Sequence, residues 1–211
     1  MKLAYLELDL GSAGPPAVVL HREGITSTVP AVEFARESGL FGRVVVPTGE
    51  YAFYPSGMSI GGTCWYRVLP GFEGTDPISL TTAVVEVADL IADVALDQPV
   101  LVGWGQGAVV ALAAALWRPG SVRSVVCVDA PRAHVDLLPR AVLDAPSPPP
   151  VLLAATDGPR RAELGGLEEF LTARLVATTT WQWAGEGTPR DLDEALADQI
   201  GKWMGQARHA P

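Results

Sequence analysis

Short apolar runs alternate with longer amphipathic stretches along most of the chain. Continuous apolar and β-branched runs predict strands at 17–20, 43–46, 99–102, 122–128, 150–155 and 178–183. These runs do not alternate between apolar and polar positions, which is typical of parallel strands covered by helices on both faces. The stretches between them predict helices at 29–38, 79–96, 107–118, 167–175 and 191–204. The order of elements therefore predicts an α/β fold, with one mostly parallel, doubly wound sheet in a single domain over 1–211.

Two segments interrupt this alternation. Residues 48–77 are rich in Gly, Ser and aromatic residues, and residues 130–149 contain several prolines. Loops of this length inside a compact domain usually line or cover a site. We expect both segments to lie near a pocket, although the second is equally consistent with a proline-stiffened crossover.

Composition excludes several classes of protein. The 211 residues include 24 acidic and 15 basic ones, which gives a net charge of −9. Because the densest basic cluster is the pair Arg160-Arg161, a nucleic-acid or anionic-membrane surface is not expected. No apolar run reaches membrane-spanning length, and the N-terminus lacks the apolar core of a signal peptide, so a cytoplasmic protein is expected. The sequence leaves a homodimer open.

Nothing in the sequence predicts a cofactor or a metal ion. Cys64 and Cys127 lack metal-ligand spacing and are expected to be reduced thiols. The glycines at 103, 105 and 107 lack the rest of a dinucleotide fingerprint, and no P-loop follows them. The predicted partner is instead a small carbonyl compound.

The most informative window is Val100–Ala108, in which a strand ends at Gly103 and an apolar helix begins at Gly107. This is the strand–turn–helix setting of the nucleophile elbow, G-x-S-x-G, whose central residue projects its side chain above the sheet. The central residue here is Gly105, which has no side chain.

At this point the chain resembles the α/β-hydrolase superfamily, and within it the small carboxylesterase/phospholipase-like branch. Residues 20–24 resemble that branch's His-Gly-x-Gly strand end, and 64–66 resemble its aromatic segment before the elbow. The resemblance places Asp157 at the position of the catalytic acid and Thr188 at that of the catalytic histidine. It also implies an oxyanion hole built from the backbone N–H groups of Glu23 and Gln106.

The resemblance therefore covers the architecture but does not extend to the catalytic nucleophile and histidine. A Ser-His-acid mechanism needs a hydroxyl activated by an imidazole, and Gly105 and Thr188 supply neither. Losing the nucleophile or the base costs on the order of 10⁶ in kcat. The sequence thus predicts a pocket without hydrolysis by the standard route.

Three carboxylates are candidates for proton transfer in such a pocket. Glu23 beside the oxyanion hole would act as a general acid or base if its side chain pointed inward, and would be ordinary surface if it pointed outward. Asp129 ends a strand at the ligand-binding edge and competes with Asp157 for the acid role. Turn capping is the alternative for both aspartates.

Other residues are expected to line the pocket rather than to react. Gln106 heads the buried helix, where its N–H suits a carbonyl or carboxylate group, directly after Gly105. Aromatic and further residues expected nearby are Trp65, Tyr66, Trp104, Cys64, Thr188 and His134. His134 lies in the segment that could swing over the pocket, or is an exposed loop residue. Cys64 as a replacement nucleophile has no histidine beside it in the sequence.

Three hypotheses follow for function. The first is a non-hydrolytic enzyme, a cyclase, isomerase, lyase or dehydratase, acting on a small carbonyl-containing metabolite. The second is an inactive hydrolase homologue that binds a ligand or a partner protein. The third is a carboxylesterase-like hydrolase with a rearranged or mutated centre, in which His134 replaces the missing base.

Overall fold

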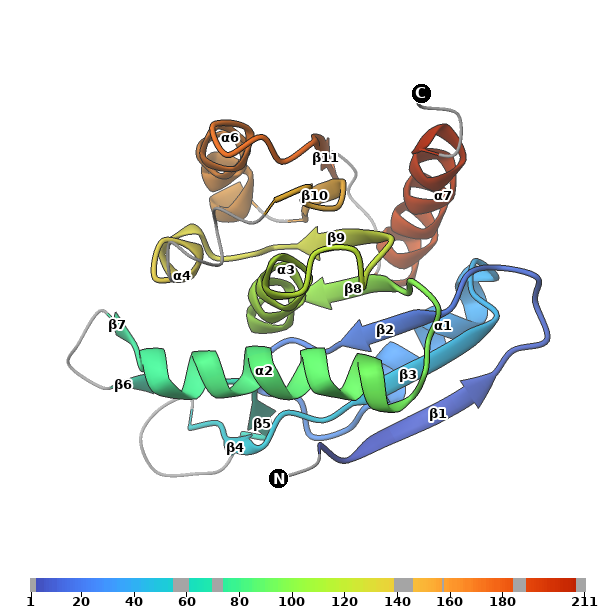
Figure 1. Cartoon of the computed structure of the whole chain (residues 1–211), viewed down its shortest axis with the longest axis horizontal. Coiled ribbons are helices and arrows are strands. Elements are labelled where there is room, and N and C mark those ends of the chain that lie inside the picture. The colour runs from blue at the N-terminus through green and yellow to red at the C-terminus, as the bar shows by residue number, and fades with distance from the viewer. Residues whose placement is uncertain are drawn as a thin grey trace.

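The computed structural model describes residues 3–54, 61–69, 74–138, 146–156, 158–183 and 189–207. Its centre is a seven-stranded sheet in the order β1-β3-β2-β8-β9-β10-β11 (Figure 1). Only β1 runs antiparallel to its neighbour. The strands span β1 Tyr5–Asp9, β2 Ala17–Leu20, β3 Arg43–Pro47, β8 Val100–Trp104, β9 Ser124–Val128, β10 Val151–Ala155 and β11 Thr178–Gln182. The predicted mostly parallel α/β sheet is confirmed.

Helices cover both faces of this sheet, as the apolar strand runs predict. One face carries α2 (Pro77–Asp93), α3 (Gln106–Trp117) and α6 (Gly158–Thr172); the other carries α1 (Val29–Ser38) and α7 (Pro189–Ala207) (Figure 1). Every residue of β2, β9 and β10 is buried. Burial on both faces removes the need for alternation, which is why these strands read as unbroken apolar runs.

Helices α2, α6 and α7 begin earlier than predicted, and the edge strand β1 was not predicted. Helix α2 begins two residues before Ser79, because the Asp76 carboxylate caps it by accepting the N–H of Ile78 at 3.1 Å. Helix α6 begins at Gly158, well before the predicted start at 167. Strand β1 alternates apolar and acidic residues, because an edge strand meets solvent.

The two interrupting segments form small elements at the carboxyl edge of the sheet. The first contains the short strands β4 Tyr51–Ala52, β5 Thr63–Cys64, β6 Val68–Leu69 and β7 Gly74–Thr75, which pair as two hairpins. The second contains α4, Arg132–Val135, which contacts α6. These described elements lie at the end of the sheet toward which β2, β8 and β9 point (Figure 1).

None of the helices in the described ranges is long and apolar enough to cross a membrane. Across the same ranges, no group of three or more His, Cys, Asp or Glu side chains is arranged to hold a metal ion.

Candidate functional site

The turn between β8 and α3 has the backbone shape of a nucleophile elbow. Gly105 has φ +53° and ψ −119°, a positive-φ conformation that residues with a side chain adopt only under strain. Its N–H donates to the carbonyl of Val128 on β9 at 2.9 Å. Because β8 lies beside β2, where the strand order reverses, the turn sits at the usual ligand-binding position of an open α/β sheet.

Two flanking glycines make this sharp turn possible. A Cβ at Gly107 would collide with the carbonyl oxygen of His21 and would lie 2.7 Å from that of Leu20. A Cβ at Gly103 would lie 2.7 Å from the nitrogen of Ala108. Both positions therefore require glycine so that β2, β8 and α3 can pack closely.

The Glu23 carboxylate lies directly over Gly105, where a serine side chain would project. An ideal Cβ at Gly105 would collide with Glu23 Oε2 and lie 3.4 Å from Oε1. Oε2 also accepts the backbone N–H of Gln106 at 2.9 Å. Glu23 thus points inward and not outward, and it occupies the N–H group that sequence reasoning assigned to an oxyanion hole.

The loop that carries Glu23 is held against the 61–64 segment. The N–H of Gly24 donates to the carbonyl of Thr63 at 2.9 Å, and the N–H of Thr63 donates to the carbonyl of Ile25 at 2.8 Å. These two hydrogen bonds hold the backbone that follows Glu23 against the 61–64 segment. The position of the carboxylate over the elbow therefore depends on a segment distant in the sequence.

Gln106 holds the neighbouring aromatic segment as well as Glu23. Its side-chain Oε1 accepts the backbone N–H groups of Trp65 at 3.0 Å and Tyr66 at 3.3 Å. The sequence pointed to the backbone N–H of Gln106 but not to this role of its side chain. The signal was available, since a buried amide at the start of an apolar helix needs a partner.

His21 is structural. Its Nε2 accepts the N–H of Gly49 at 2.9 Å, which leaves Nδ1 to donate to the carbonyl of Arg22 at 2.6 Å. The ring also stacks on Trp65, with 4.8 Å between centroids. Burial lowers the pKa of His21. With both nitrogens engaged, the imidazole has no free site for a substrate proton.

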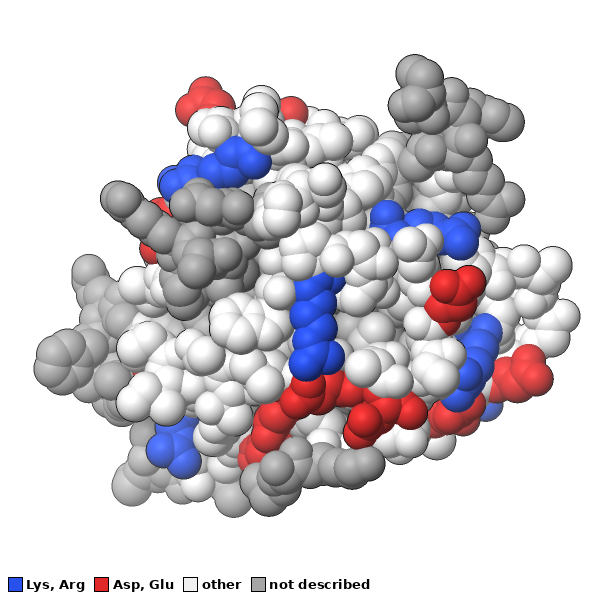
Figure 2. Space-filling model, in the orientation of Figure 1, with Lys and Arg blue, Asp and Glu red and all other residues white. Residues whose placement is uncertain are grey.

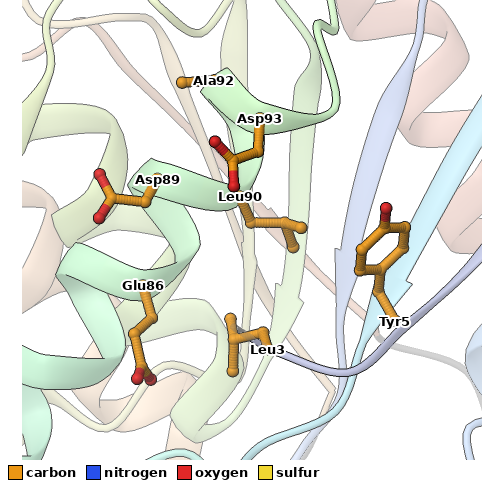
Figure 3. Close-up of a pocket in the computed structure, with 7 residues that line it drawn as sticks. All are labelled: Leu3, Tyr5, Glu86, Asp89, Leu90, Ala92 and Asp93. Carbon is orange, nitrogen blue, oxygen red and sulfur yellow. The ribbon is translucent and has the colours of Figure 1, made fainter. Parts of the chain in front are cut away.

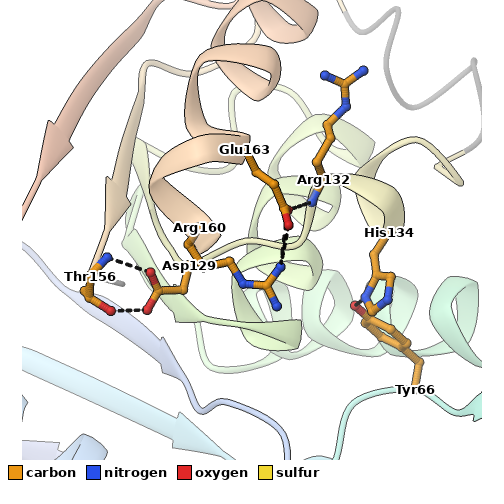
Figure 4. Close-up of polar contacts among 7 residues, drawn as sticks. All are labelled: Tyr66, Asp129, Arg132, His134, Thr156, Arg160 and Glu163. Carbon is orange, nitrogen blue, oxygen red and sulfur yellow. Dashed lines mark hydrogen bonds and ion pairs between the residues drawn. The ribbon is translucent and has the colours of Figure 1, made fainter. Parts of the chain in front are cut away.

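Asp129 is likewise held by protein groups. Its carboxylate accepts the backbone N–H of Thr156 at 2.7 Å and also the Thr156 hydroxyl (Figure 4). The backbone of Asp129 has φ +52° at the end of β9. These bonds tie the ends of β9 and β10 together and favour the capping role over a reactive one.

The Asp129–Thr156 contact predicts a specific stability effect. Thr156→Val is expected to lower the free energy of unfolding by about 1–3 kcal/mol, because the buried carboxylate loses a hydroxyl donor. Thr156→Ser keeps the hydroxyl and serves as the matched control. Urea unfolding of the three proteins measures the difference; equal stability of the valine variant would contradict this role.

The other predicted pocket residues divide into two groups. Trp65 and Tyr66 are buried beside Gln106, and the Tyr66 hydroxyl bonds His134 at 2.8 Å (Figure 4). Trp104 packs edge-on against Phe34 of α1, so it belongs to the core of the other sheet face rather than to this cluster. Asp157 and Thr188 lie outside the described residues.

Neither cysteine resembles a nucleophile. Burial, together with the charge of Glu23, raises the pKa of Cys64 to about 11, and burial raises that of Cys127 to about 12. We therefore expect a thiol reagent at pH 8 to modify the native protein at least roughly a hundredfold more slowly than the urea-unfolded chain. Rapid labelling of native Cys64 would contradict this and would reopen its catalytic role.

An acidic surface cavity lies away from the elbow. A cavity of about 340 Å³ is lined by Leu3, Tyr5 and the outer face of α2, including Glu86, Asp89 and Asp93 (Figure 3). Acidic side chains gather across this part of the surface (Figure 2). No residue of the elbow lines this cavity. The candidate site is therefore the cluster around Glu23 and not this cavity.

Comparison with known proteins identifies the class to which this fold and elbow belong. The profile of the Alpha/beta hydrolase family matches residues 63–210, and the chain belongs to that family. No curated protein matches the sequence significantly.

Solved structures agree with the family assignment. Esterase PE8 is 19% identical with a TM-score of 0.72, and the alignment covers 96% of this chain and 99% of that one. A Mesorhizobium loti carboxylesterase is 19% identical at 0.73, with 96% and 94% coverage. Zea mays acyl-protein thioesterase 2 is 17% identical at 0.69, with 97% and 98% coverage. At these identities the likeness shows the α/β-hydrolase fold alone.

Proposed function

We propose that this protein is a non-hydrolytic enzyme that moves a proton on a small carbonyl compound. Isomerisation, elimination, dehydration and cyclisation can each proceed by polarising a carbonyl group and moving a proton. The observation that carries the proposal is the Glu23 carboxylate over Gly105, at the position from which an elbow normally presents its nucleophile. A glycine offers no hydroxyl, so the reactive group at this point of the fold is the carboxylate.

The two oxygens of Glu23 are suited to different tasks. Oε2 is held by the N–H of Gln106 at the start of α3, where the helix dipole favours negative charge. Oε1 accepts no hydrogen bond from any residue in the described ranges. The first contact fixes the carboxylate, and the second oxygen is left to take a proton from a bound compound.

Asp129 supports the assignment by contrast. Both of its oxygens accept bonds from Thr156, whereas one oxygen of Glu23 accepts none from the described residues. We therefore assign the proton transfer to Glu23. Asp157, the other candidate from the sequence, stays a proposal, because it lies outside the described residues.

Serine-type hydrolysis is disfavoured even though the structural neighbours include esterases and a thioesterase. Acyl transfer needs a nucleophile and a donor for the developing oxyanion. Gly105 lacks the first, and the Gln106 N–H is already bonded to Glu23. Hydrolysis would therefore need Glu23 to leave this contact and activate a water molecule.

A second candidate function is an inactive homologue that binds a ligand or a partner protein. The same Glu23–Gln106 bond favours it, because the carboxylate fills the donor that a substrate carbonyl would use. Such a protein would bind small compounds without converting them.

One experiment separates these three functions. The purified protein is incubated in D₂O with a panel of small ketones, lactones and keto acids, and loss of the α-proton signal is followed by ¹H NMR. A parallel panel of aryl esters and acyl thioesters tests hydrolysis. Exchange without hydrolysis is the expected result. Hydrolysis without exchange would overturn the proposal in favour of the esterase, and inertness in both panels would overturn it in favour of the binding protein.

A further inference from the structure

His134 comes to the site from α4 and rests on the buried tyrosine of the aromatic segment. The hydroxyl of Tyr66 lies 2.8 Å from His134 Nδ1, and the two rings meet edge to face with 5.5 Å between centroids (Figure 4). Tyr66 is 0% exposed and His134 is half-buried. The imidazole is therefore the more accessible ring of this pair, and the phenol lies on its buried side.

The burial of Tyr66 determines which nitrogen of His134 carries the proton. A buried hydroxyl needs an acceptor for its hydrogen, and His134 Nδ1 is its partner among the described residues. The Tyr66 O–H therefore donates to Nδ1, and a neutral imidazole must carry its own hydrogen on Nε2. Nε2 points away from Tyr66 and bonds no residue in the described ranges, so its N–H is available to a ligand.

The surroundings of His134 keep the imidazole neutral at pH 7. Burial lowers its pKa, the positive charge of Arg160 on α6 lowers it further, and the negative charges of Glu23 and Glu163 raise it. Its own helix contributes Arg132 and Asp136, which pair with each other at 2.9 Å. The net direction is downward from 6.5, so the uncharged form with a hydrogen on Nε2 predominates.

Gln106 connects this pair to Glu23. Its backbone N–H bonds Glu23 Oε2, and its side-chain Oε1 accepts the backbone N–H of Tyr66. Gln106 therefore holds both the Glu23 carboxylate and Tyr66, whose hydroxyl bonds the His134 imidazole. The charge on Glu23 influences the pKa of both Tyr66 and His134, as expected for neighbouring groups.

We propose that His134 is a second catalytic residue, which donates from Nε2–H to the carbonyl oxygen of the substrate while Glu23 removes the proton from the adjacent carbon. Tyr66 is the positioning residue that fixes the tautomer of His134. This inference rests on the proposed function of Glu23. In this role the Nε2–H of His134 replaces the Gln106 N–H as the oxyanion donor, because the Gln106 N–H is already bonded to the Glu23 carboxylate.

The step balances without any co-reactant. The C–H bond breaks and its proton moves to Glu23 Oε1, while the electron pair forms a C=C bond and leaves negative charge on the carbonyl oxygen. The N–H of His134 stabilises that enolate by a hydrogen bond, and the proton on Glu23 returns to the same carbon or to another. A carboxylate base and a neutral imidazole donor divide the work in this way in enolising isomerases.

The substrate class follows from this division. It is a carbonyl compound with an acidic C–H next to the carbonyl group, because Glu23 removes that proton while the His134 N–H binds the carbonyl oxygen. Esters without such a proton are not substrates.

The test combines exchange kinetics with NMR of the imidazole. With the ketone that the wild type exchanges fastest in D₂O, His134→Ala is expected to slow exchange roughly 10²–10³-fold, as loss of one oxyanion donor does. His134→Gln, whose amide N–H approximates the position of Nε2–H, is expected to recover part of the rate. Tyr54→Phe, at an exposed tyrosine, is the control for Tyr66→Phe.

¹⁵N NMR provides a readout that a purely structural role would not change. Wild-type His134 is expected to show the Nε2–H tautomer, and Tyr66→Phe is expected to mix both tautomers and slow exchange while the protein stays folded. Normal exchange in His134→Ala, or an Nδ1–H tautomer in the wild type, would overturn the role of His134 and leave that of Glu23 intact. Absence of exchange in the wild type would instead overturn the role of Glu23, and that of His134 with it.

Discussion

Glu23→Gln is expected to slow α-proton exchange of a small carbonyl compound by roughly 10²–10⁴-fold, the usual contribution of a general base. The amide keeps the size of the side chain and its oxygen can still accept the Gln106 N–H, but no carboxylate oxygen remains to take a proton. Circular dichroism and urea unfolding establish that the variant is folded, and ¹H NMR in D₂O measures the rate.

Two further variants make this result specific. Glu33→Gln removes one negative charge from an exposed position on α1 and is expected to leave the exchange rate unchanged. Glu23→Ala empties the space over Gly105, so added formate is expected to restore part of the rate by binding the Gln106 N–H. An unchanged rate in Glu23→Gln would show that the base is another group.

Gly107→Ala is expected to lower the free energy of unfolding by about 3 kcal/mol or more. The added methyl group meets backbone carbonyls of Leu20 and His21, and backbone atoms of a buried strand cannot rotate away as a side chain can. The clash would also move α3 away from β2 and so displace the N–H of Gln106. Urea unfolding followed by tryptophan fluorescence measures the loss.

The matched control is another helical glycine. A Cβ at Gly165 in α6 would meet nothing within 4 Å. Gly165→Ala is therefore expected to raise the free energy of unfolding by about 0.5–1 kcal/mol, since alanine loses less backbone entropy in a helix. If both variants changed stability equally, the close packing of the elbow would not be the reason for glycine at 107.

Most of the sheet could be predicted because its strands are buried on both faces. Residues 17–20 and 43–46 coincide with strand cores that are almost wholly buried, so apolar continuity alone marks them. Strand β1 escaped the same criterion, since it pairs only with β3 and its other edge meets solvent. Helix α6 was placed too late, because its first turns carry charged rather than apolar side chains.

The site divides along the same line. The elbow was predictable because glycines stand at every second position from 103 to 107, and this spacing indicates a sharp local turn of the backbone. The Glu23–Gln106 bond joins residues 83 positions apart, and the Tyr66–His134 bond joins residues 68 positions apart. No local pattern specifies such pairs, so the sequence alone does not determine whether the Glu23 side chain points inward or outward.

The amino-acid sequence by itself determined the layered α/β architecture, the place of the elbow and the glycine at its centre, because each depends on hydrophobic periodicity or on the conformational range of one residue. Only the tertiary structure decided that Glu23 covers Gly105, that Asp129 is held by Thr156, and that Trp104 faces the opposite layer. The direction of a side chain at a strand end depends on the partners that distant loops bring to it, and these become neighbours only when the sheet is assembled.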